Sequence, residues 1–441
     1  MSTNINEKKA IIKAELQSIK NSNKPDMTGV KIRYGNKVKS YDVYKIPLKL
    51  LVFNKDNGRI GTRVKSHEKQ IGEINEYTEN GSNLIRQYLI DSKKERNDKT
   101  LESLARNGQM RHGIVTSDGI IVDGNRRASL LTELYNNRDS FCKKFKLNDI
   151  DFTGYFLAII LDEDISKKEI HRLETEVQMG EDEKVDYNAI EKYLKVRDLL
   201  EDEFTPSEIG RMMGESTTQI NTWLETLKLM DEYLLNFNYV GIYTMLDKRE
   251  DQFLTLCKDL KKFTNKTSYT NWVPNKRDIS KLKLVGFDYI RCQYEGKEFR
   301  NLTKSKKDKI DGIFTDKTTW EAFYNGHIEN KKTVNEDSVE KIQEVATGND
   351  YIEALIQRDK EFTTTVKKGF VENIKRSANK IETKILNDEP YKLMFEALEL
   401  IKSIDTNQKN FYVDRVREIN SDIYDVVDRF RFKLQKGYQD E

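Results

Sequence analysis

The stretch IVTSDGIIVDGNRRASLL, residues 114–131, constrains what this chain can fold into more than any other part of the sequence. Its two β-branched runs, 114–116 and 120–122, are separated by Ser117-Asp118-Gly119. Two such runs joined by a turn that contains Asp-Gly are typical of a tight β-hairpin. The sequence therefore predicts a hairpin here, and its second strand leads directly into Gly124 and the two arginines after it.

A helix is predicted immediately after this hairpin, with two arginines at its start. Gly124 allows a sharp turn of the backbone, and Asn125 is a good helix N-cap. Arg126 and Arg127 come next, in the first turn of the helix. Guanidinium groups beside a helix N-terminus favour an anion, and a phosphate fits best. The alternative interpretation is that the two arginines only solvate the helix end.

Several motifs together resemble the N-terminal domain of the ParB family, whose fold is shared with sulfiredoxin. They are IPLKLL at 46–51, Leu101-x-x-Leu104, GQM at 108–110 and the stretch 114–131. The resemblance implies that a GxRR-type box at the start of a helix holds a nucleoside triphosphate, CTP in the chromosomal members of the family. The residues that match this box are Gly124, Arg126, Arg127 and Ala128, with Asn125 between them.

The cysteines argue against sulfiredoxin chemistry. Sulfiredoxins carry a catalytic cysteine in this loop, where this chain has Asn125. The three cysteines present, Cys142, Cys257 and Cys292, all lie elsewhere and have no CxxC spacing. That usage indicates a reducing compartment rather than a disulfide scaffold or a zinc ribbon.

The same resemblance implies two further parts of a nucleotide site. The family's first box ends in an arginine, a role that Arg59 or Arg63 would take here; the alternative is a plain surface turn. LETEVQ at 173–178 resembles the third box, in which acidic and amide groups hold Mg²⁺. Gln178 matches that box, and Glu176 is the expected Mg²⁺ ligand, or else a residue on a solvated helix face. The expected cofactor is therefore a nucleoside triphosphate, CTP or ATP, with Mg²⁺.

Residues 205–227, TPSEIGRMMGESTTQINTWLETL, have the spacing of a helix-turn-helix. Thr205 and Ser216 are predicted to cap its two helices, Gly214 makes the turn, and Gly210 lets the helices cross closely. In ParB relatives such a unit also follows the third box, so DNA is the expected partner. The side chains expected to read base edges are Thr217, Thr218, Gln219, Asn221 and Thr222.

The charge of this unit does not by itself favour DNA. It contains one basic residue, Arg211, against three glutamates, so its net charge is −2. Because phosphate attraction supplies much of the affinity for DNA, positive charge has to come from elsewhere. The segment 297–309, with six Lys/Arg against two acidic residues, is the best source. The next candidates are Lys258, Lys261, Lys262 and Lys266. The alternative is a helix-turn-helix that serves only as a packing module.

The overall composition sets few limits on function. The chain has 441 residues with 76 basic against 74 acidic side chains, so any basic surface has to be local. Its four histidines are scattered without the spacing of metal ligands. Neither a signal-peptide core nor an apolar run of membrane-spanning length occurs, so we expect a cytoplasmic protein without a membrane partner.

The C-terminal part is predicted to be helical. One apolar pattern runs from residue 362 to 385 and is expected to end at Pro390, and a further helix is expected over 391–404. From Tyr412 to Phe430 apolar residues recur in alternating steps of four and three, which is a heptad seam of under three heptads. We expect these helices to form a homodimer or to bind a partner protein; the alternative is an internally packed bundle.

The expected class is therefore α+β: a small mixed ParB/sulfiredoxin-like domain, followed by helical regions. The predicted domains are 1–165, with an insertion over 61–100; 166–263, which contains the helix-turn-helix; a small mixed unit at 264–336; and the helical region 337–441. The expected function is a ParB-like DNA-binding protein switched by a nucleotide. The alternatives are a nuclease or nucleotide hydrolase of ParB type, and a helical adaptor with a degenerate nucleotide site.

Overall fold

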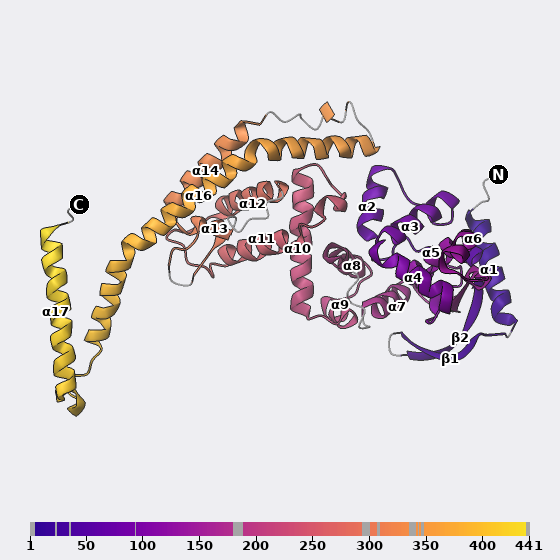
Figure 1. The fold of residues 1–441 in the computed structure, drawn as a ribbon, viewed down its shortest axis with the longest axis horizontal. Helices are drawn as coiled ribbons and strands as arrows, with labels where there is room; N and C mark the ends of the chain where they lie inside the picture. The colour runs from indigo at the N-terminus through magenta and orange to yellow at the C-terminus, as the bar shows by residue number, and fades with distance from the viewer. Residues whose placement is uncertain are drawn as a thin grey trace.

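A small sheet followed by helices makes up the part of the chain that the computed structural model describes. It covers residues 5–437 apart from 23, 35–36, 93, 180–187, 293–299, 307–308, 335–340, 343 and 345–347. All regular elements described after residue 160 are helices (Figure 1). The structure thus confirms the predicted α+β class, with a mixed sheet near the N-terminus and helices after it.

The sheet has five strands in the order β1-β2-β5-β3-β4. Its strands are β1 (Met27–Tyr34), β2 (Lys37–Pro47), β3 (Gly113–Val115), β4 (Ile121–Asp123) and β5 (Tyr155–Ile160). All neighbours are antiparallel except β3 and β5, which run parallel. The predicted hairpin is confirmed as β3 and β4, which form one edge of the sheet. The chain that leaves this edge at Asp123 enters the helix with the two arginines.

Helices cover both faces of this sheet. One face and the helices around it share a single apolar core. These helices are α1 (Ile5–Asn21), α2 (Gly61–Gln70), α3 (Glu79–Asp91), α4 (Lys94–Asn107), α5 (Asn125–Asn136) and α6 (Arg138–Phe145), with short 3₁₀ turns at Leu48–Leu50 and Asp151–Gly154. On the other face, α7 (Lys167–Met179) packs Leu173 against Ile114, Val122 and Ile159.

The stretch 61–100 belongs to this core. It was expected to be a polar insertion with one helical patch, but it forms α2, α3 and most of α4. Val64, Ile85, Leu89 and Leu101 are buried in the same cluster as the strands. The few apolar residues of these helices are spaced one or two turns apart, and this sparse pattern is still enough to bury one face of each helix.

The predicted helix-turn-helix is confirmed as α9 (Pro206–Met213) and α10 (Thr217–Asn236). Thr205 caps α9, where its hydroxyl accepts from the N–H of Glu208, and Ser216 caps α10. A Cβ atom on Gly210 would lie 2.7 Å from the carbonyl oxygen of Glu215, so this close crossing requires glycine. α10 continues past the predicted end at Leu227, because Met230, Tyr233 and further apolar residues stay buried along it.

The remaining helices form two further apolar clusters. They are α8 (Ala189–Glu201), α11 (Glu250–Thr264), α12 (Lys276–Arg291), α13 (Arg300–Thr303) and α14 (Lys317–Lys332), with 3₁₀ turns at Tyr243–Leu246 and Ile313–Thr315. The stretch 264–336, expected to be a mixed unit, is helical in its described residues. Its core is shared with the long helix α16 (Gly348–Lys402), which contributes Phe362, Val366 and Phe370.

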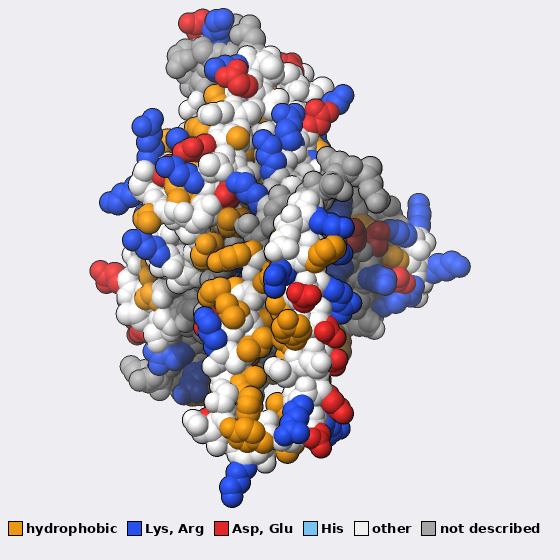
Figure 2. All heavy atoms as spheres, turned by 90° about the vertical axis from the view of Figure 1, so that its left-hand side faces the viewer, with side chains coloured by type: hydrophobic (Ala, Val, Ile, Leu, Met, Phe, Trp, Pro, Cys, Tyr) orange, Lys and Arg blue, Asp and Glu red, His pale blue; other side chains and the backbone are white. Residues whose placement is uncertain are grey.

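The prediction that a helix ends at Pro390 is wrong. The helix α16 is 55 residues long and continues past this proline. A proline removes one helical hydrogen bond. Leu386 and Tyr391 beside it are exposed, so water can solvate the carbonyl group that loses its donor. A 3₁₀ turn at Lys409–Tyr412 then reverses the chain into α17 (Asp414–Lys436). This end projects away from the rest of the molecule (Figure 1), and Figure 2 shows hydrophobic side chains along it.

Candidate functional site

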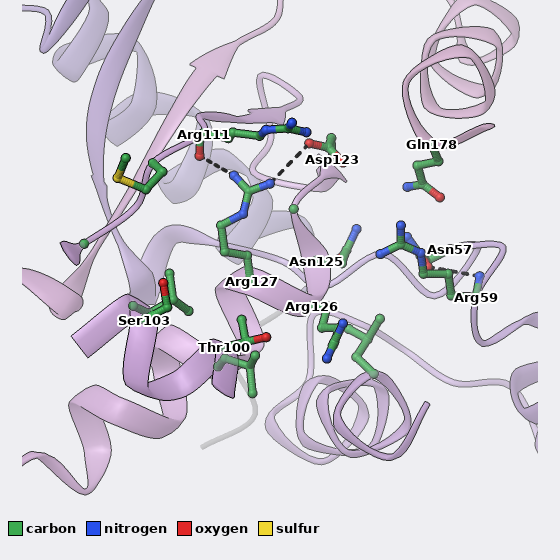
Figure 3. Close-up of a pocket in the computed structure, with 16 residues that line it drawn as sticks. Asn57, Arg59, Thr100, Ser103, Arg111, Asp123, Asn125, Arg126, Arg127 and Gln178 are labelled. Atoms are coloured by element: carbon green, nitrogen blue, oxygen red, sulfur yellow. Dashed lines mark hydrogen bonds and ion pairs between the residues drawn. The ribbon is translucent and has the colours of Figure 1, made fainter. Parts of the chain in front are cut away.

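A hollow of about 340 Å³ lies at the N-terminus of α5, within the size range of small-molecule sites, about 300–1,000 Å³. Figure 3 shows its lining, which comes from six separate parts of the N-terminal half of the chain. They are the loop after the first 3₁₀ turn, α3, α4, the segment 108–111 before β3, the stretch from the end of β4 into α5, and the end of α7. The loop, the helix start and α7 are the three places where the sequence predicted parts of a nucleotide site.

Gly124 shapes the bend into α5. Its φ is +97°, and a Cβ atom there would lie 2.7 Å from the ring of Phe156, which is completely buried. Gly124 rather than Asn125 occupies the N-cap position, so the predicted capping role of Asn125 is wrong. The buried amide of Asn125 instead accepts from the N–H of Asn54 at 3.0 Å and donates to the carbonyl of Ile121 at 2.7 Å. It thus fixes the loop after β2 to the hairpin.

Arg126 and Arg127 both line the hollow but extend to different sides of it (Figure 3). Arg126 donates from Nε and Nη2 to the amide oxygen of Asn97, at 3.2 and 2.9 Å. Arg127 donates to the carbonyl oxygens of Arg111 and His112, and its Nη2 lies 3.8 Å from Asp123. These hydrogen bonds of both guanidinium groups go to neutral oxygen atoms, and the carboxylate of Asp123 lies at ion-pair distance from Arg127.

The lining as a whole is strongly positive. Among the described residues it contains four arginines, at positions 59, 111, 126 and 127, and one carboxylate, that of Asp123. The pKa of His112 is lowered, first by burial and then by the positive charge of Arg127. Ala128, the last residue of the predicted box, is buried behind the helix start, where its N–H donates to the carbonyl of Gly124 at 2.8 Å. The electrostatic character of the site favours a polyanion.

The two boxes predicted beside this helix both reach the hollow, the first through Asn57 and Arg59 and the third through Gln178. Arg59 lines it, whereas the alternative, Arg63, points toward Asp91, with 3.9 Å between the charged groups. Gln178 also lines it and donates to the carbonyl oxygen of Val122 at 3.2 Å. Since Val122 belongs to β4, Gln178 attaches the end of α7 to the strand that leads into α5.

Glu176, the predicted Mg²⁺ ligand, does not line the hollow. Its carboxylate lies 3.5 Å from Nε of Arg172 on the same helix, and burial raises its pKa. Within the part of the chain that the structure describes, no cluster of three or more His, Cys, Asp or Glu residues could hold a metal ion. Of the described residues that line the hollow, Asp123 is the one with a carboxylate. It is therefore the described lining residue whose side chain suits an Mg²⁺ ion.

Sequence reasoning missed several residues of the hollow. Thr100 and Ser103 present hydroxyl groups from α4, and Asn97 on the same helix holds Arg126. These residues lie in or next to the stretch expected to be an insertion, where no sequence motif pointed to a binding site. Arg111 directly follows the GQM motif, and that position was the one signal that could have identified it.

The side chains expected to read DNA gather at the exposed N-terminal end of α10. Thr217, Thr218 and Asn221 are exposed, and Gln219 and Thr222 are half-buried. One turn further along, Glu225 forms an ion pair with Lys261 of α11 at 3.0 Å. Lys261 therefore lies beside this surface with its charge paired to Glu225. That Lys258, Lys261, Lys262 and Lys266 supply positive charge for DNA stays a prediction. The segment 297–309 lies only partly within the described residues.

In the described parts of the chain, no helix combines the length and the apolar character that crossing a membrane requires. Comparisons with protein-family models, with characterised proteins and with solved structures find no match to this chain.

Proposed function

We propose that this chain is a DNA-binding protein of ParB type, whose N-terminal unit binds a nucleoside triphosphate, CTP or ATP, together with Mg²⁺. The observation that carries the proposal is the hollow at the start of α5, whose described lining residues include four arginines and one carboxylate. A triphosphate carries several negative charges, and arginines bind phosphate oxygens in bidentate fashion. The first turn of α5 adds backbone N–H groups and the positive end of the helix dipole.

The helix α7 supplies a route from this site to the helix-turn-helix. Its last turn brings Gln178 into the hollow, and the same helix packs against α9. The buried ion pair between Glu174 of α7 and Lys195 of α8, at 2.7 Å, fixes α7 to the helical region. A ligand that binds one arrangement of α7 more tightly would shift the position of α9 and α10. This coupling is how the nucleotide would act as a switch for DNA binding.

The experiment is a calorimetric screen of CTP, ATP, GTP and UTP with Mg²⁺ on the full chain. We expect one or more of them to bind, and Arg126→Ala/Arg127→Ala to weaken the affinity at least about a hundredfold, since each charge-assisted hydrogen bond contributes roughly 1.5–3 kcal/mol. Arg138→Ala is the matched control, because Arg138 lies in the same unit outside the hollow. Unchanged binding by the double variant, with an unchanged circular dichroism spectrum, would reject the site.

DNA recognition is tested separately. Gln219→Ala/Asn221→Ala should weaken sequence-selective binding in a footprint by about tenfold or more, because each good contact to a base edge contributes roughly 1–3 kcal/mol. The matched control is Asn136→Ala, an exposed amide on α5. An unchanged footprint would show that the helix-turn-helix only packs within the protein and does not read DNA.

One observation favours a second candidate, a helical adaptor whose nucleotide site no longer switches anything. It is the exposed apolar surface of the last part of α16 and of α17. The two candidates differ when the nucleotide screen is repeated with DNA present: in a switch the nucleotide affinity changes when DNA is bound, and in an adaptor it does not.

A further inference from the structure

The strands β1 and β2 continue past the rest of the sheet as a two-stranded ribbon, which consists of the paired residues 30–34 and 37–41. β2 pairs with β5 from Val43 to Pro47, whereas its residues 37–41 pair with β1. β1 is the edge strand, so among the described strands none flanks its outer side. A two-stranded ribbon is only marginally stable in water, so this extension adds little to the stability of the sheet.

The two faces of the ribbon differ in character. Side chains alternate between the faces of a strand, and Ile32 is buried on the face that packs against α7. Lys31 and Arg33 lie on the opposite face and are exposed. Val38, the cross-strand partner of Arg33, is 59% exposed, so no other element covers this face. Residues 31–40 carry four basic side chains and no acidic one. The ribbon therefore concentrates positive charge on an open surface.

This charge lies close to the helix-turn-helix, with α7 in between. The helix α7 packs against both β1 and α9. Burial raises the pKa of Glu176 on α7, and the charges of Arg172 and Arg33 oppose this rise, so Arg33 lies within electrostatic range of α7. Figure 1 shows the ribbon and the N-terminal end of α10 along the same lower edge of the molecule. The basic face and the helix expected to read DNA can therefore meet one extended partner.

The spacing of these elements fits a DNA duplex. From α10 to α9, to α7 and to β1 there are three packing distances of roughly 10 Å each, so the ribbon lies within about 30 Å of α10. One turn of DNA is about 34 Å long. With α10 in a major groove, the ribbon would meet phosphate groups within one turn of that groove. The helix-turn-helix has a net charge of −2, and Lys261 beside it is paired with Glu225, so the ribbon supplies charge that this unit lacks.

We propose that the β1–β2 ribbon is a second DNA contact, which binds the phosphate backbone beside the groove that α10 reads. The inference rests on the proposed DNA-binding function and identifies the source of its electrostatic affinity. Phosphate contacts hold a protein in position on the duplex but carry no sequence information. Loss of the ribbon charges should therefore weaken binding to every sequence equally, whereas changes in α10 should reduce selectivity.

The test is fluorescence anisotropy of the full chain with a labelled duplex of about 40 base pairs and mixed sequence, over roughly 50–200 mM salt. Lys31→Gln/Arg33→Gln removes two positive charges. We expect the affinity to fall about tenfold or more, and the slope of log K against log salt to become less steep by about 2. Lys39 stays unchanged, because it forms an ion pair with Asp162.

Arg138→Gln/Lys143→Gln is the matched control, because both side chains are exposed on α6, which lies away from the helix-turn-helix in Figure 1. It should leave affinity and slope unchanged, and circular dichroism checks that both variants are folded. Lys31→Glu/Arg33→Glu should weaken binding further than the Gln variant, because it adds repulsion.

The outcomes separate the ribbon from the proposed function. If the wild-type chain binds DNA and Lys31→Gln/Arg33→Gln binds with the same affinity and slope, the ribbon is not a contact, and the helix-turn-helix proposal stands. Charges on an edge strand also prevent aggregation. A variant that aggregates but keeps its DNA affinity would assign the charges to that role and overturn the inference. A wild-type chain that binds no DNA at any salt concentration would overturn both.

Discussion

Gly124→Ala tests whether the bend before α5 is what shapes the proposed nucleotide site. Its φ of +97° lies in the left-handed region, where a residue with a Cβ atom costs roughly 1–2 kcal/mol. The added methyl group would also meet the ring of Phe156 at 2.7 Å. That ring cannot move aside easily, because it is completely buried and also packs against Gly113. Overpacking of this kind costs roughly 1–3 kcal/mol, so the expected loss in the free energy of unfolding is about 2–5 kcal/mol.

Two other glycines allow the strain and the clash to be separated. Gly29 has a φ of +73° with nothing within 4 Å of an added Cβ, so Gly29→Ala should show the backbone strain alone. Gly61 has neither a positive φ nor a neighbour within 4 Å, so Gly61→Ala should be close to neutral. Gly61→Ala should therefore have the highest melting temperature of the three variants, Gly29→Ala the next and Gly124→Ala the lowest. Each kcal/mol lost from the free energy of unfolding should lower the melting temperature by about 2–4 °C.

Thermal melting and urea unfolding, followed by circular dichroism, measure these differences. Calorimetry with the nucleotide that binds best then shows whether the displaced start of α5 also loses affinity. If Gly124→Ala melts at the same temperature as Gly29→Ala, the contact with Phe156 imposes no constraint, and the argument that this bend requires glycine is refuted.

Two further predictions concern the junction between the N-terminal unit and the helices. Burial raises the pKa of Glu191 from its ordinary 4.5 to about 8, so the stability that this group contributes is present below pH 4.5 and is lost as the pH rises through 8. Glu191→Gln should therefore melt close to wild type at pH 5 and roughly 5–10 °C higher at pH 9, and equal melting temperatures at both pH values would contradict this. Lys195→Met leaves the buried carboxylate of Glu174 without its partner and should cost about 3–5 kcal/mol in urea unfolding. Adding Glu174→Gln should restore most of that loss, and an equally unstable double variant would show that the pair is not the cause.

Local patterns predicted the parts of this fold in which neighbouring residues decide the structure. The hairpin around Asp118-Gly119, the caps Thr205 and Ser216, and the turn at Gly214 all form as predicted. In these places the short-range hydrogen bonds and the backbone freedom of glycine are enough. The same local logic placed Asn125 at the N-cap, where Gly124 is found instead, because Asn125 makes its hydrogen bonds to Asn54 and Ile121.

Residues that meet only through the tertiary fold were harder to predict. Arg59, Arg127 and Gln178 come from three distant boxes and do line one hollow, but Glu176 lies outside it. Each residue along a helix turns the side-chain direction by about 100°, so Glu176, two residues before Gln178, points to nearly the opposite side of α7. Asn97 has no sequence signal at all, since its role depends on α4 packing beside α5.

The 55-residue helix α16 is continuous but bends along its course (Figure 1). At about 1.5 Å per residue its curved axis is roughly 80 Å long. Its first half is anchored near the helix-turn-helix, where Tyr239 donates to Asp359 at 2.8 Å, and its far end leads through a 3₁₀ turn into α17. The helix therefore sets the distance between α10 and α17, which a flexible linker would leave variable. Removing seven residues, about two turns, would shorten the helix by about 10 Å and leave the direction of α17 nearly unchanged, whereas removing two would turn α17 by about 160°.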